Sequence, residues 1–187
     1  MIDPTLKRAL GQMTYGANVV ACRSEDLVRA YTSTWTYQLS FDEPVVGISV
    51  SPKHDTYPLI EQEGWFTVSI LAGDQIEAAQ YFSYPGHRFR YRGDFLESVG
   101  DLPVVRDCVA WLYARIFDRV GIRGHTLFLA GVERVGEGRL REPALTYSSR
   151  KGWRIADTPA RAPGESVRDR LLRLVEDDAE GPGGVAR

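Results

Sequence analysis

The sequence predicts a mainly β protein with short helices, folded as one domain over residues 1–156. Several segments of about four to eight residues are rich in valine or aromatic residues and end at turn-forming residues, as strands do. The chain has 187 residues and a hydrophobic content of 43%, which suits one core and is too little length for two ordinary domains. Short strands joined by tight turns favour a β-barrel.

A short helix is expected at the start of the chain. Asp3 can cap it, Pro4 suits its first turn, and Gly16 would end it. Apolar residues recur between them at helical spacing, at Leu6, Leu10 and Met13. This apolar stripe is expected to cover another part of the protein.

Strands are expected to follow this helix. Segments 17–23, 27–34 and 44–51 are short and rich in valine or aromatics, and a turn at residues 24–26 joins the first two. A helix is then expected over residues 56–63, because Pro58 falls in its first turn and Gly64 follows it.

The next expected elements are a strand at residues 65–71 and a helix at residues 75–82. Asp74, with Glu77 three residues later, resembles a capping box at the start of this helix. After the helix the chain loses its regular pattern until residue 108.

Two long strands are expected after residue 108, and the first has two apolar faces. One face carries Cys108, Ala110, Leu112, Ala114 and Ile116. The other carries Trp111, Tyr113, Arg115 and Phe117. Because the inner face of a barrel fills the core, an aromatic outer face needs a second partner, and a homodimer would supply it.

Composition excludes several classes of protein. A net charge of -2 and a pI near 6.0 give no basic field for nucleic acid. Cys22 and Cys108 lie among apolar residues and lack metal-ligand spacing, which fits core residues in a reducing cytoplasm. No apolar run approaches the roughly 20 residues of a membrane span, and the N-terminus has no signal-peptide core.

The last segment, residues 157–187, is rich in proline, glycine and charge, and is expected to be a C-terminal extension. One amphipathic helix is a candidate within residues 165–177, followed by a mobile tail.

A separate segment, residues 86–94, alternates basic and aromatic residues. It is either a solvated loop or a contact for the adenylate half of NAD(P)H or FAD, with Arg88 as the candidate residue.

No motif for hydrolysis or metal binding is present. The three histidines, His54, His87 and His125, are far apart in sequence, and neither a nucleophile elbow nor a zinc-protease motif occurs. A protein without its own nucleophile is expected where a cofactor carries the chemistry.

Two polar segments flank one apolar strand. The first alternates hydroxyl and aromatic residues over 32–37, and the second, SPKHDT, offers hydroxyls, a positive charge and an imidazole over 51–56. The second set suits a phosphate monoester, although an edge strand and an ordinary solvated loop explain the same residues.

The order of these segments resembles the flavin reductase family of FMN-binding split-barrel proteins, and in particular its flavoredoxin-like branch. The matching text is YTSTWTYQLSFDEP followed by VVGISVSPKHDTYPLI, and further matches lie at residues 64–71, 108–120 and 124–135. The resemblance spans about residues 6–147. It implies a homodimeric split β-barrel.

The resemblance also implies a cofactor and site residues. The cofactor is FMN, or less favourably FAD, with NAD(P)H as cosubstrate. His125 is assigned to the nicotinamide side, against a purely structural role for a histidine at a strand start. The flavin-binding candidates are Thr32, Ser33, Thr34, Trp35, Thr36, Gln38, Ser49, Ser51, Lys53, His54, Thr56, Ser69 and Arg88.

The chain departs from the family pattern at three places. Arg123 and Gly124 precede His125 where the family has Asp, Ser69 replaces the usual Asn, and Glu43 replaces the first of two prolines. A shorter hydroxyl in place of an amide would weaken one flavin contact.

The expected reaction is hydride transfer from NAD(P)H to flavin, with reduced flavin passing to a partner monooxygenase. Two alternatives stay open: an electron-transfer flavoprotein that keeps its FMN, and a flavin-binding barrel without activity.

Overall fold

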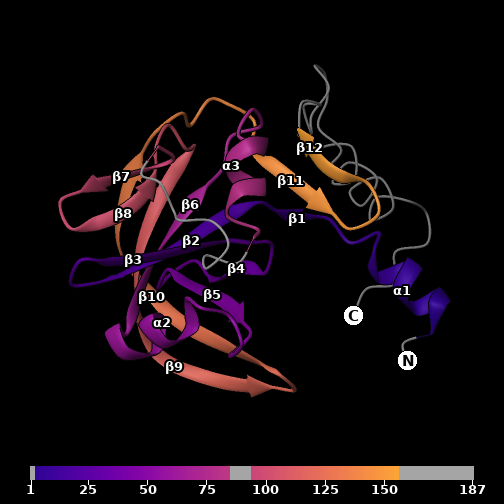
Figure 1. Cartoon of the computed structure of the whole chain (residues 1–187), viewed down its shortest axis with the longest axis horizontal. Helices are drawn as coiled ribbons and strands as arrows, with labels where there is room; N and C mark the ends of the chain where they lie inside the picture. Colours follow the sequence, from indigo (N-terminus) through magenta and orange to yellow (C-terminus); the bar gives the residue numbers. More distant parts are fainter. Residues whose placement is uncertain (1–2, 85–93, 156–187) are drawn as a thin grey trace, which may run out of the picture. The chain divides into compact units, whose positions relative to one another are not determined.

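The computed structural model describes residues 3–84 and 94–155, and in this part of the chain strands predominate (Figure 1). A seven-stranded antiparallel sheet has the order β3-β2-β6-β9-β10-β5-β4. Its strands are β2 (Asn18–Ser24), β3 (Leu27–Ser33), β4 (Thr36–Ser40), β5 (Val45–Val50), β6 (Trp65–Ile70), β9 (Ala110–Ile122) and β10 (His125–Glu137). The mainly β prediction is confirmed.

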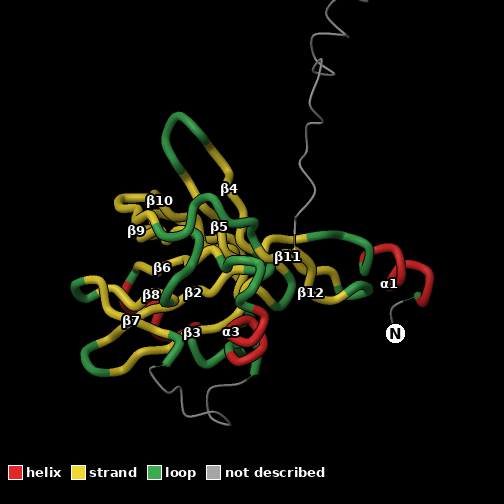
Figure 2. Tube along the Cα trace, turned by 90° about the horizontal axis from the view of Figure 1, so that it is seen from above, coloured by secondary structure: helices red, strands yellow, loops and turns green. Residues whose placement is uncertain are grey.

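Smaller elements lie around this sheet (Figure 2). A three-stranded sheet joins β1 (Tyr15–Gly16), β11 (Leu145–Ser148) and β12 (Gly152–Ile155), and a hairpin joins β7 (Leu96–Val99) to β8 (Leu102–Val105). The helices are α1 (Pro4–Leu10), α2 (Tyr57–Glu63) and α3 (Ile76–Tyr81). The sequence pattern did not reveal β1, β7, β8, β11 or β12, because each has at most four residues.

Apolar residues cover both faces of the large sheet, because neighbouring residues of a strand point to opposite sides. One cluster contains Val20, Phe66, Val68, Ala114 and Phe128, together with Ile60 of α2. The other contains Val19, Ala21, Phe82, Val105 and Leu145, and joins the sheet to α3, β8 and β11. The chain therefore covers much of the second face itself.

The structure confirms most of the expected turns and helix ends. Asp3 accepts hydrogen bonds from the backbone N–H groups of Thr5 and Leu6, and Gly64 ends α2 in the left-handed conformation. Glu25, also at positive φ, makes the turn between β2 and β3. Each follows from local chemistry that the sequence shows directly.

The first helix is shorter than predicted. It ends at Leu10 with Gly11 as its C-cap, because Tyr15 and Gly16 pair with β11 instead. No residue of α1 is buried, and Leu6, Leu10 and Met13 are about half exposed, so the expected cover for their stripe is absent within the described residues.

The predicted capping box at Asp74 is wrong. Gln75 is the N-cap of α3 and makes no side-chain cap hydrogen bond. Both oxygens of Asp74 instead accept from Arg139, at 2.6 and 2.8 Å, and this contact lowers the pKa of Asp74. A charge-assisted pair with a distant residue has replaced the local cap.

The two faces of β9 are partly as predicted. Leu112, Ala114 and Ile116 join the first core cluster, as expected for one face. Trp111, expected at an interface, is partly buried and packs against the second cluster of its own chain. The strand starts at Ala110, so Cys108 lies before it. The exposed part of β9 is its C-terminal half, where Phe117 is 62% exposed.

The far half of β9 and the start of β10 form a hairpin that extends past α2 (Figure 1). An ion pair between Arg119 of β9 and Glu61 of α2 ties the hairpin to the helix. The tyrosine hydroxyl of Tyr57, in α2, lies 3.1 Å from the hydroxyl of Thr126, in β10. These contacts place the first residues of β10 beside the loop that precedes α2.

Candidate functional site

A cavity of about 200 Å³ lies where the chain between β3 and β4 meets the end of β5 and the start of β10. Most of its lining side chains are polar or aromatic. The residues are Tyr31, Thr32, Ser33, Thr34, Trp35, Ser49, Val50, Ser51, His54 and His125. Eight of the predicted site residues therefore meet at one place.

The backbone between β3 and β4 is held against β5. The N–H of Ser49 donates to the carbonyl of Trp35 at 3.0 Å. Thr32 is fixed from the other side, since its hydroxyl donates to the carbonyl of Ala79 in α3 at 2.6 Å. The wall that carries Thr32 to Trp35 is thus anchored at both ends.

Two aromatic contacts mark the walls of this cavity. Trp35 meets His125 edge-on, with ring centroids 5.1 Å apart. His54 lies against Tyr31, with centroids 4.6 Å apart. Tyr31 was not predicted as a site residue, because its ring contact joins positions 23 residues apart and leaves no local pattern.

The tight turn before β10 brings His125 to the cavity. His125 pairs with Ile122 across the hairpin, so Arg123 and Gly124 alone make the turn, and both have positive φ. Glycine adopts this conformation without strain. The Arg-Gly that replaces the family's Asp therefore acts as a hairpin turn.

The loop after β5 is only partly turned toward the cavity. Ser51 and His54 line it, whereas the side chain of Lys53 is exposed and does not. The N–H of Lys53 donates to the hydroxyl of Ser51 at 3.3 Å. Thr56 is fully buried, and its hydroxyl has no hydrogen-bond partner among the described residues.

His54 is the titratable group of this loop with a shifted pKa. Burial lowers the pKa of the imidazole, and the Asp55 carboxylate, 3.2 Å from Nδ1, acts in the opposite direction. Burial also raises the pKa of Tyr31, so its phenol stays protonated. At neutral pH the cavity therefore contains a largely uncharged His54 beside a neutral tyrosine.

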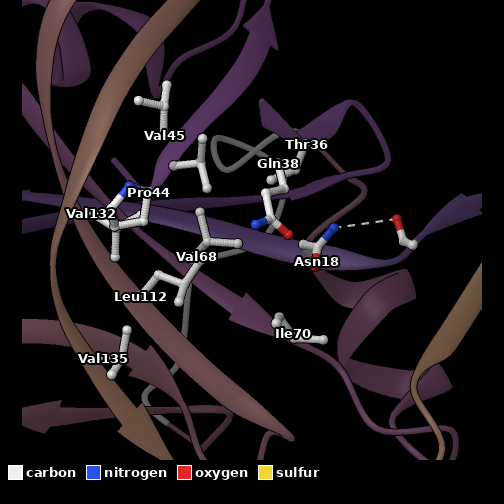
Figure 3. A pocket seen from close by; sticks show the side chains of 12 residues that line it. Asn18, Thr36, Gln38, Pro44, Val45, Val68, Ile70, Leu112, Val132 and Val135 are labelled. Atoms are coloured by element: carbon white, nitrogen blue, oxygen red, sulfur yellow. Dashed lines mark hydrogen bonds between the residues drawn. The ribbon is translucent and has the colours of Figure 1, made fainter. Parts of the chain in front are cut away.

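Thr36 and Gln38 belong to a second cavity of about 450 Å³ (Figure 3). Its polar edge also includes Asn18, whose amide donates to the carbonyl of Gly16. The rest of the lining is apolar: Pro44, Val45, Val46, Val68, Ile70, Leu112, Val132 and Val135. The alternation of a strand separates these two residues from Trp35.

Ser69 lines neither cavity. Ser69 is buried on the opposite face of β6 from Val68, and its hydroxyl accepts from the N–H of Val105 at 2.9 Å. It is placed to hold β8 on the sheet, away from both cavities, so the structure does not bring it to the flavin-binding candidates. Arg88, like the extension at 157–187, lies outside the described residues.

In residues 3–84 and 94–155, no three His, Cys, Asp or Glu side chains are grouped to hold an ion. Nor is any helix of this part long and apolar enough to cross a membrane. Cys22 is fully buried in the first core cluster, and burial raises the pKa of its thiol to about 12, with a smaller contribution from Glu63.

Solved structures with a similar fold include flavin reductases. The native state of the flavin reductase PheA2 matches with a TM-score of 0.73 over 84% of this chain and 100% of its own, at 24% identity. A flavin reductase domain protein from Arthrobacter sp. FB24 matches with a TM-score of 0.77 over 87% of this chain and 100% of its own, at 20% identity.

Sequence relatives agree with this fold. The NADH-dependent flavin reductase of Rhodococcus sp is 28% identical over 138 residues, which are 70% of this chain and 74% of that protein. The high molecular weight rubredoxin of Moorella thermoacetica is 24% identical over 161 residues, 83% of this chain and 70% of that protein.

The sequence profile of the "Flavin reductase like domain" matches residues 10–154, which include every strand of the large sheet and all residues that line both cavities. The chain therefore belongs to the flavin reductase family.

Proposed function

We propose that this protein binds FMN in the cavity between Trp35, Ser51 and His125 and reduces it with NADH or NADPH. The observation that carries the proposal is the convergence of five serine and threonine hydroxyls and two imidazoles on one cavity. The NADH-dependent relative from Rhodococcus supports the choice of a nicotinamide donor.

The cavity suits the phosphate and ribityl end of the flavin better than its ring. About 200 Å³ is below the roughly 300–1,000 Å³ of sites that enclose a whole drug-sized ligand. The hydroxyls of Thr32, Ser33, Thr34, Ser49 and Ser51 match the hydroxyl-rich ribityl chain and its phosphate. The ring would then lie at the open end, beside Trp35 and His125.

The residues present fit FMN by their donor chemistry. The flavin, when bound, supplies the hydride acceptor, and the protein supplies position and electrostatics. Backbone N–H groups between Thr34 and Gln38 are candidates to donate to the ring's pyrimidine oxygens. His125 is the candidate contact to the nicotinamide, and Lys53 adds a positive charge next to the phosphate end.

A homodimeric split barrel is part of this proposal. Apolar side chains stay exposed on β4 and its following turn, on the β9–β10 hairpin and near the end of β10, with Phe41 at 85%, Phe117 at 62% and Val135 at 65%. Val135 also lines the second cavity (Figure 3), so a second copy of the chain that covers the end of β10 would close this cavity.

A second candidate is an electron-transfer flavoprotein that keeps its FMN. The match to a high molecular weight rubredoxin over 83% of the chain favours it. The two functions differ in cofactor exchange and in donor. One sample of purified protein loaded with FMN is passed through gel filtration, and a second sample, with FMN present, is mixed anaerobically with NADH or NADPH.

Loss of the flavin on the column and rapid bleaching by either nucleotide would support the reductase. A flavin that stays bound and is not reduced by either nucleotide would favour the electron-transfer protein. For the reductase, a partner monooxygenase is expected to consume the reduced flavin.

A further inference from the structure

The imidazole of His54 is held between the protein core and the flavin cavity. Its ring packs against Tyr31, which is buried and belongs to the first core cluster. The same imidazole lines the cavity, next to Ser51. Because one side of the ring rests on the core, its nitrogens keep fixed directions.

Hydrogen bonding locates the proton on this ring. The backbone N–H of Thr56 donates to His54 Nδ1 at 3.3 Å. A nitrogen that accepts a hydrogen bond carries no proton, so the neutral ring is protonated at Nε2. His54 can therefore donate from Nε2 to an anion without being charged.

The carboxylate of Asp55 offers the ring a second state. Its Oδ1 lies 3.2 Å from the same Nδ1. If Nδ1 gained a proton, the ring would become an ion-pair partner of Asp55 and would no longer accept from Thr56. A doubly charged phosphate near Nε2 would add a second negative charge and favour this cationic state.

We propose that His54 selects flavins that end in a phosphate monoester, by taking up one proton from solvent onto Nδ1 when the phosphate binds beside Nε2. The inference rests on the proposed function, since it requires the flavin phosphate to enter this cavity. A terminal monoester carries close to two negative charges at pH 7.5. Each phosphate of FAD carries one, and riboflavin carries none, so they draw the proton less or not at all.

The other titratable groups around His54 do not replace it. Tyr31 keeps its proton, because burial raises the pKa of its phenol. Asp55 and Lys53 lie on the same loop and supply opposite charges, and His125 lines the same cavity from β10. Riboflavin has the same ring as FMN and no phosphate, so a comparison of the two ligands distinguishes proton uptake by His54 from proton uptake by His125.

Calorimetry measures the proton uptake. FMN, FAD and riboflavin are titrated into the purified protein at pH 7.5, in two buffers that differ in ionisation enthalpy. The expected uptake is about one proton for FMN, clearly less for FAD and none for riboflavin. The Kd for FMN should also rise by up to about tenfold per pH unit above neutrality, because the ligand raises the pKa of the ring it binds.

Two variants test the assignment. His54→Gln keeps an N–H donor and should abolish proton uptake, flatten the pH dependence and weaken FMN binding by about tenfold, with riboflavin affinity unchanged. Asp55→Asn should still bind FMN and take up less than half as much proton. Circular dichroism establishes that both variants are folded.

The outcomes separate this inference from the proposed function. FMN binding without proton uptake, equal uptake with riboflavin, or unchanged uptake in His54→Gln would each overturn the role of His54 and leave flavin binding intact. If none of the three flavins binds, both the inference and the proposed function are overturned.

Discussion

Trp35 and His125 approach each other edge-on, with ring centroids 5.1 Å apart and an angle of 67° between the ring planes. Trp35 lies just before β4, and His125 is the first residue of β10. In the large sheet, β5 lies between these two strands. Because Trp35 is 42% exposed, the pair stands at the open end of the cavity. A ring that binds there would meet both side chains.

Replacement of His125 tests its assignment to the nicotinamide side. His125→Ala should slow the reduction of bound FMN by NAD(P)H by at least about tenfold, which corresponds to about 1.4 kcal/mol in the barrier. FMN affinity should change little, because the phosphate end is held elsewhere. Anaerobic stopped-flow reduction with each nucleotide measures the rate, and calorimetry measures the affinity.

Trp35→Phe is the matched control for this experiment, since it keeps an aromatic edge beside His125 while altering the same ring pair. It should reduce the rate less than His125→Ala does. Equal reduction rates in the wild-type protein and His125→Ala would make this histidine structural.

Lys53 tests the phosphate loop. Lys53→Ala should weaken FMN binding by roughly tenfold, because hydrogen bonds to charged groups contribute about 1.5–3 kcal/mol. Riboflavin should bind the variant as it binds the wild type. Calorimetry gives both affinities, and Lys7→Ala, on α1, serves as a lysine control remote in sequence from the loop. The same FMN affinity in Lys53→Ala and wild type would remove Lys53 from the site.

The exposed apolar residues of the turn after β4 and of the hairpin test the homodimer. Phe41→Asp and Phe117→Asp should each shift the protein from dimer to monomer in sedimentation at micromolar concentration, because a charge buried in an apolar interface is costly. Leu140→Asp, at another half-exposed apolar position, should leave the dimer intact. A monomeric wild type that binds FMN tightly would contradict the dimer.

Gly136 tests the packing of Trp111 within the chain. A Cβ atom at Gly136 would lie 2.1 Å from the indole Cε2, so Gly136→Ala should destabilise the protein by about 1–3 kcal/mol. Gly131, in the same strand, has open space within 4 Å of the position that an alanine methyl group would take, so Gly131→Ala is the control and should be close to neutral. Urea unfolding of both variants measures the difference. If the two variants have the same free energy of unfolding, the indole of Trp111 moves aside without destabilising the protein.

The sequence was most informative where local chemistry decides the structure. The cap at Asp3, the end of α2 at Gly64 and the strand over 44–51 depend on residues a few positions apart, and all were predicted. Asp74 shows the limit of this reasoning, because its partner Arg139 is 65 residues away. A distant cation competes with a local cap and leaves no mark on the local pattern.

The candidate site was predicted in the same uneven way. The hydroxyl and histidine residues on either side of β5 were identified, and eight of the predicted residues meet at one cavity. Tyr31 was missed because only the fold brings it to His54. Ser69 was included because of its place in a motif, although its hydroxyl bonds β8. Trp111 was expected at an interface, since periodicity assigns a face and does not show what covers it.

Trp35 and Thr36 are adjacent in sequence and line different cavities, one rich in hydroxyls and the other largely apolar. The two linings meet at one contact, since the hydroxyl of Thr36 donates to the hydroxyl of Ser33 at 3.0 Å, so a substitution at Thr36 would reach both cavities. Insertions and deletions act differently. Removing one residue between Thr34 and Gln38 would turn the β4 side chains that follow it to the opposite face of the strand and so take Gln38 out of the second cavity.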